Sequence, residues 1–97
     1  MDDLLLSKIR LSVVAELLNV QWVSFTDLAR AIETTNGNLG AHLAKLVDAG
    51  YIAEEKTYAG RRPLSRYSLT ETGRAAFVAH VRQLEALLSA APEGNRS

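Results

Sequence analysis

The sequence predicts a mainly helical α+β fold, in which three helices are followed by a two-stranded hairpin and one last helix. Over most of the chain, apolar residues recur at steps of three and four, which is the helical period. Between about residues 51 and 69 the pattern changes to the alternation that is typical of strands. With 97 residues, 47% of them hydrophobic, the chain can form one modest core, so we expect a single domain over residues 1–97.

The first helix is expected to run from Leu4 to Val20. Its apolar residues fall on one face at helical spacing, which indicates a side packed against the core. They are Leu6, Ile9, Val13, Leu17 and Val20.

The second and third helices each follow a residue type that favours a helix start. Ser24 and Thr35 can accept hydrogen bonds from the first free backbone amides of a helix. The second helix then turns Leu28, Ala29 and Ile32 inward. The third helix, over 36–49, turns Leu39, Leu43, Leu46 and Val47 inward. Gly50 suits the left-handed position that often ends a helix.

The hairpin should consist of strands over 51–58 and 64–69, joined by a turn around 59–63. Tyr67 and Leu69 alternate with polar neighbours, which predicts one buried face. Thr70 is expected to cap a last helix over 71–91, and residues 92–97 form a polar tail that we expect to be frayed.

Composition excludes several classes of function. The absence of cysteine excludes disulfides, thiolate chemistry and cysteine-based zinc sites. His42 and His80 lie on different predicted helices without a carboxylate cluster, so we expect no catalytic residue, no metal and no cofactor. The N-terminus lacks the pattern of a signal peptide, and no apolar run is long enough to cross a bilayer; we therefore expect a cytoplasmic protein without a membrane partner.

Charge is balanced overall but unevenly placed. Eleven basic and eleven acidic residues give a net charge of zero. One stretch nevertheless holds four cations and no acid: Lys56, Arg61, Arg62 and Arg66. The planar guanidinium group pairs well with phosphate and fits a narrow minor groove, which favours nucleic-acid binding. For Arg66, an ion pair with Glu54 or Glu55 across the hairpin is an equally open alternative.

Two short amphipathic segments joined by a polar break indicate a helix-turn-helix, whose second helix can enter a major groove. Four pieces of sequence extend this indication when taken in order: residues 35–39, 42–51, 60–63 and 67–74. Together they resemble the winged helix-turn-helix of small transcriptional regulators of the MarR and ArsR groups. The resemblance covers the chain from Ile9 to about Leu88. It implies that the helix over 36–49 lies in the major groove, while the hairpin, called the wing, places residues 58–66 on the backbone or adjacent minor groove.

The resemblance also implies which residues of the third helix face DNA. They are Asn36, Asn38, Gly40, Ala41, His42 and Lys45. Asparagine can read adenine, and lysine can reach guanine or phosphate. Alternatively, the asparagines only start the helix and His42 is solvated. The small residues Gly40, Ala41 and Ala44 stand where related proteins often carry long polar ones, so either base readout is sparse or the backbone approaches DNA more closely.

An apolar stripe on the last helix extends beyond what the small core could cover, which usually marks an interface. Together with the N-terminal leucines it predicts a dimer surface comprising Leu4, Leu5, Phe77, Val81, Leu84, Leu87 and Leu88. His80 is expected to be half-buried on the face toward the partner. The alternative is that this helix folds back over its own domain.

These observations predict a homodimeric regulator of transcription that binds specific sites in double-stranded DNA and is not an enzyme. The alternative is a winged-helix module that assembles with other proteins and binds no DNA. The sequence identifies no small-molecule effector.

Overall fold

The structure, a computed structural model, describes residues 2–90 and confirms the predicted α+β order. Within these residues, one 3-10 turn, four α-helices and three strands follow one another. They are η1 (Asp3–Leu6), α1 (Lys8–Glu16), β1 (Val23–Ser24), α2 (Phe25–Ala31), α3 (Asn36–Asp48), β2 (Ile52–Ala59), β3 (Arg62–Leu69) and α4 (Glu71–Ser89). The predicted tail over 92–97 lies outside the described residues.

The core lies where α1, α2 and α3 meet the root of the hairpin. Its buried members are Leu5, Val13, Val14, Leu17, Leu28, Ile32, Leu39, Leu43, Leu46, Ile52 and Tyr67. The predicted inward faces of the second and third helices are therefore confirmed. Burial of these core side chains is the main favourable contribution to the free energy of folding, at roughly 2 kcal/mol for each large aliphatic side chain.

Helix starts also follow the sequence signals. The hydroxyl oxygens of Ser24 and Thr35 accept hydrogen bonds from the amides of Asp27 and Asn38, each at 3.1 Å. Gly50 has a φ angle of +77°, which is the left-handed conformation expected after α3.

The prediction of one continuous helix from Leu4 to Val20 is wrong. The chain first makes a 3-10 turn, and α1 then begins directly after Ser7. The Ser7 hydroxyl oxygen accepts a hydrogen bond from the Arg10 amide at 3.2 Å. Asp2 caps the preceding turn by accepting from the Leu4 amide at 3.0 Å. Two capping side chains thus divide a stretch whose apolar pattern runs through both parts, and the helix ends at Glu16.

The sheet has the antiparallel order β1-β3-β2, with β3 in the middle. The two-residue strand β1 was not predicted, because so short a segment has no readable pattern. The turn is shorter than the predicted 59–63: Ala59 pairs with Arg62, which leaves only Gly60 and Arg61 between the strands. Gly60 has a φ of +65° and Arg61 has no positive φ, as in a type II′ hairpin turn.

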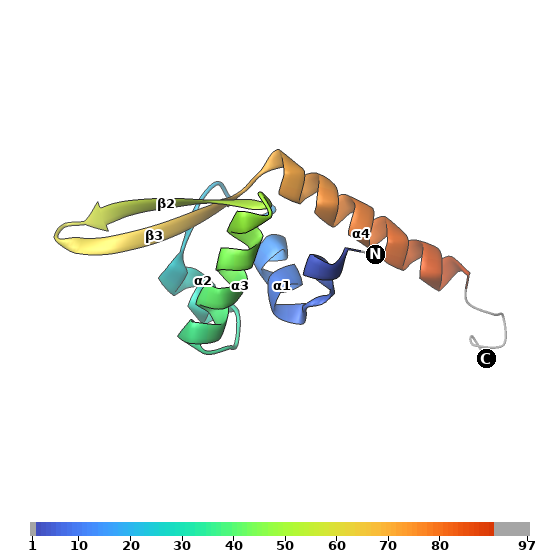
Figure 1. Cartoon of the computed structure of the whole chain (residues 1–97), viewed down its shortest axis with the longest axis horizontal. Helices are drawn as coiled ribbons and strands as arrows, with labels where there is room; N and C mark the ends of the chain where they lie inside the picture. The colour runs from blue at the N-terminus through green and yellow to red at the C-terminus, as the bar shows by residue number, and fades with distance from the viewer. Residues whose placement is uncertain (1, 91–97) are drawn as a thin grey trace.

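The start of α4 is fixed tightly against the end of α3. The Thr70 hydroxyl lies 2.6 Å from the Gly50 carbonyl oxygen and 2.9 Å from that of Tyr51. A Cβ atom on Gly73 would lie 2.1 Å from the Tyr51 carbonyl oxygen, so only glycine fits there. Beyond the part that contacts α1, α4 extends away from the other helices, on the side opposite to the hairpin (Figure 1).

His80 on α4 is 2% exposed, so the prediction of a half-buried side chain facing a partner is wrong. It is buried within its own chain, where its Nδ1 atom has no hydrogen-bond partner among residues 2–90. Ala76 and Phe77 of the same helix pack against the core, and α4 contacts α1, so the first half of α4 belongs to the domain body.

Candidate nucleic-acid interface

Helix α3 has an exposed face opposite its buried leucines. Asn36, Asn38, Ala41 and Lys45 are exposed, as a groove-binding helix requires. Gly40 is half-buried beside the hairpin, where it lines a small cleft together with Glu54.

The two glycines of α3 are not required by the fold. A Cβ atom on Gly37 or Gly40 would meet no protein atom within 4 Å, and neither residue has a positive φ. Each glycine in a helix interior costs about 1 kcal/mol relative to alanine. The open space above the helix is therefore available to an approaching surface.

His42 points toward α1. Its Nδ1 atom lies 2.9 Å from Nη1 of Arg10, whose Nε donates to the Leu4 carbonyl oxygen at 2.7 Å. Because a guanidinium group only donates, His42 must be neutral and accept through Nδ1. Burial, followed by the charges of Arg10 and Lys45, lowers the pKa of His42. In this arrangement His42 joins α3 to the N-terminal turn.

The outer part of the wing carries cations that no acid neutralises. Lys56, Arg61 and Arg62 are exposed and form no ion pair within residues 2–90. The neighbouring Glu54 is engaged at the root of the wing, where it accepts a 2.7 Å hydrogen bond from the Tyr67 hydroxyl. Burial and this hydrogen bond raise the pKa of Tyr67 to about 12.

Arg66 differs from the other three cations. Its Nε and Nη2 atoms donate to one oxygen of Glu55 at 2.9 and 2.6 Å, which is one of the ion pairs that the sequence left open. Its guanidinium carbon also lies 4.7 Å from the centre of the Trp22 ring. Trp22 was not predicted as part of the site, because nothing local in the sequence connects this loop residue to β3.

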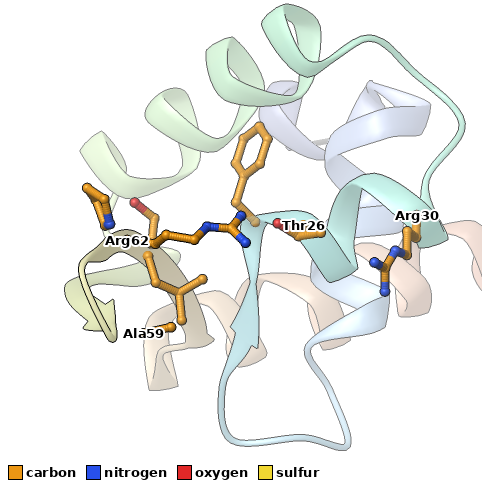
Figure 2. A pocket seen from close by; sticks show the side chains of 8 residues that line it. Thr26, Arg30, Ala59 and Arg62 are labelled. Atoms are coloured by element: carbon orange, nitrogen blue, oxygen red, sulfur yellow. The ribbon is translucent and has the colours of Figure 1, made fainter.

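A cleft of about 460 Å³ separates the wing from α2. Its lining includes Thr26 and Arg30 of α2 and Arg62 and Ser65 of β3. Figure 2 shows the Arg62 side chain extending from the wing toward Thr26, with Arg30 farther along α2. Arg30 also lies 3.6 Å from Asp27 in an exposed ion pair. Thr26 and Arg30 were not predicted as contact residues; a cation on the helix preceding α3 was the signal for Arg30.

The predicted dimer surface is only partly accessible. Leu84, Leu87 and Leu88 at the end of α4 are 38%, 61% and 77% exposed. Phe77 and Val81 are half-buried, as is Leu4. Leu5 is 1% exposed and belongs to the core, so it offers no surface in this conformation.

No helix among residues 2–90 is long and apolar enough to cross a membrane. Within the same residues, the acidic and histidine side chains form no group of three or more that could hold a metal ion.

Helices α2 and α3, together with the adjoining antiparallel hairpin, define a winged helix-turn-helix protein. Comparison with known families agrees: residues 9–88 match the family described as winged helix DNA-binding domain. The chain belongs to this family, and the predicted resemblance is confirmed.

Solved structures share the fold. A transcriptional regulator homologue from Pyrococcus horikoshii OT3 is 24% identical, with a TM-score of 0.81 over 89% of this chain and 85% of that one. A structure from Enterococcus faecalis V583, assigned to the MarR family, is 23% identical, with a TM-score of 0.79 over 97% and 84%. Bacillus subtilis PadR, solved in complex with operator DNA, is 18% identical, with a TM-score of 0.70 over 77% of this chain and 48% of PadR.

Proposed function

We propose that this chain is a transcriptional regulator that binds specific sites in duplex DNA as a homodimer, with α3 in the major groove and the wing on the backbone or minor groove. One observation carries the proposal: Lys56, Arg61 and Arg62 on the wing are exposed and form no ion pair within residues 2–90, and α3 has an exposed face in the same domain. The family to which the chain belongs and the structural likeness to PadR, solved with operator DNA, support it.

The wing and the cleft beside α2 suit a DNA backbone. Arg62 on one side and Arg30 on the other can pair with phosphate oxygens, while Thr26 can donate a hydroxyl hydrogen bond. Contacts of this kind position a protein on DNA without reading its sequence. Sequence choice is then left to α3, where Asn36, Asn38 and Lys45 are exposed side chains able to reach base edges.

The exposed leucines on α4 suit a second copy of the chain. Leu87 and Leu88 would be unfavourably hydrated in a monomer, whereas a two-fold pairing of α4 helices would cover them in both copies. Such a dimer would place its two α3 helices about one DNA turn apart, ~34 Å, and would bind a roughly palindromic site.

One observation favours the alternative of a protein-assembly module. Between Gly37 and Ala44 the exposed face of α3 has no cation, and the net charge of the chain is zero. In that case acidic side chains of a protein would take the place of phosphates at Arg61 and Arg62.

A salt titration separates the two functions. The purified chain is incubated with a random duplex and with duplexes selected from a random pool, and affinity is measured at several salt concentrations. A DNA regulator retains a preferred sequence, and its log affinity falls with log salt at a slope of about −0.9 per phosphate contacted. An assembly module yields no enriched sequence and no measurable duplex binding.

A further inference from the structure

Arg66 lies at the point where the wing leaves the domain body. Within the described sheet, β1 pairs with β3 only at Tyr67 and Arg66, and Arg66 is the member nearer the tip of the wing. Beyond it, residues 62–65 pair with β2 alone. Arg66 is therefore the outermost position at which the described sheet joins the wing to the domain body.

Three residues contact Arg66. Arg66 pairs in the sheet with Ser24 on one side and Glu55 on the other, which places the three side chains on one face. Glu55 accepts both guanidinium hydrogen bonds, and the Trp22 ring lies within cation–π distance. These contacts occupy the guanidinium group that a phosphate would otherwise bind.

The loop that carries Trp22 is itself anchored. The Arg74 guanidinium on the first turns of α4 donates to the Leu18 carbonyl oxygen at 3.0 Å. The Trp22 loop is thus attached to the domain body, and the Arg66 guanidinium group of the wing stacks on the Trp22 ring.

From this geometry we propose that Arg66 is a positioning residue for DNA binding, rather than a phosphate contact. By holding the root of the wing to Trp22, with its guanidinium group fixed by Glu55 of the same hairpin, it sets the distance between Arg62 and α2 across the cleft. The effect on DNA rests on the proposed function, whereas the effect on the wing of the free protein does not.

The test uses Arg66→Lys, which keeps the charge and removes both the planar stacking and the paired donation to Glu55. Arg82→Lys, on an exposed part of α4 away from the wing and from α3, is the matched control. We expect Arg66→Lys to weaken duplex binding about three- to tenfold, because a mobile wing must be ordered on docking, while the salt slope stays at the wild-type value. The control should change affinity less than twofold.

Two readouts in the free protein accompany the binding data. Trp22 is the single tryptophan, so its fluorescence emission reports loss of the stacked guanidinium, and amide exchange in β3 should become faster in Arg66→Lys. Unfolding followed by circular dichroism verifies that both variants are folded.

Unchanged affinity of Arg66→Lys would overturn the proposal, as would a salt slope reduced by about 0.9 in Arg66→Ala, which indicates a direct phosphate contact. If the wild-type chain binds no duplex, the regulator function fails, and the free-protein readouts still decide the positioning role. Unchanged Trp22 emission and unchanged exchange would then overturn it.

Discussion

The wing and the end of α4 project from opposite sides of the domain body, and their surfaces are of opposite kinds (Figure 1). Residues 56–65 on the wing carry three cations and no acid, whereas the last turns of α4 expose leucines. A cationic projection suits a polyanion and an apolar one suits another protein surface. Under the proposed function, this difference would let one small domain separate DNA binding from self-association, because neither surface takes part in its core.

Charged substitutions among the exposed leucines of α4 should have the largest effect on DNA affinity. Leu84→Glu or Leu88→Glu would place an unpaired carboxylate in the dimer seam, which is costly. We expect a monomer by sedimentation equilibrium at tens of micromolar, and operator affinity lower by about 100-fold or more, because two-site binding is lost. Binding of each half-site should persist. A wild-type monomer at the same concentration would refute the dimer.

Next in size is the effect on sequence choice by α3. Asn38→Ala or Lys45→Ala should lose roughly 1–3 kcal/mol at one base pair, if the contact is bidentate. Selection from a random duplex pool measures this directly. The same preferred site from both variants would rule these residues out as readers.

The cationic projection is tested by changing its tip. Replacing Arg61 and Arg62 together by alanine should lower the affinity for specific and random duplexes alike, by roughly tenfold. The loss is moderate because exposed ionic contacts are individually weak. The salt slope should flatten by about 1.8 for two phosphates. Equal affinity of variant and wild type for both duplexes would exclude the wing as a DNA contact.

Between the two projections, α3 offers a test in which stability and binding move in opposite directions. Gly40→Ala has room for its methyl group, so it should raise the free energy of unfolding by about 1 kcal/mol. If the helix backbone approaches the groove closely, the same methyl group should weaken duplex binding. Denaturant unfolding measures the change in stability, and a binding titration measures the change in affinity. A stabilised variant with wild-type affinity would argue against a close approach of the α3 backbone to DNA.

The smallest expected effect concerns His42 and pH. Its pKa is lowered in the folded state, so unfolding takes up a proton once the pH falls below the ordinary value of about 6.5. Stability should therefore fall as the pH is lowered through this range and level off below the folded pKa. His42→Gln retains an acceptor for Arg10 and should lose part of this pH dependence. An identical pH profile in both proteins would contradict the neutral role of His42.

Features specified by neighbouring residues could be predicted, and those that depend on distant partners could not. Ser24, Thr35 and Gly50 act within one helical turn, so the start of α2 and both ends of α3 follow from the sequence. The stacking of Arg66 on Trp22 joins residues far apart in the chain, and no local pattern contains it.

The candidate site divides in the same way. The cations of the wing were visible as a charge run, but their partners were not: the sequence left Arg66 open between two acids, and only the strand register places Glu55 opposite it. Likewise, helical spacing places His42 on α3, but its orientation toward Arg10 follows from the packing of α1.

The tight contact at Gly73 has a consequence for the operator. Because the start of α4 packs closely on the end of α3, the place of each residue of α4 relative to α3 follows from the helical rise of 1.5 Å per residue along the α4 axis. In a dimer joined through α4, the spacing between the two DNA half-sites would then depend on where along this helix the partner packs. One residue inserted between His80 and Leu84 would rotate the exposed leucines by about 100° around the helix axis. The length of α4 would thus encode the spacing of the binding site, independently of the residues that touch DNA.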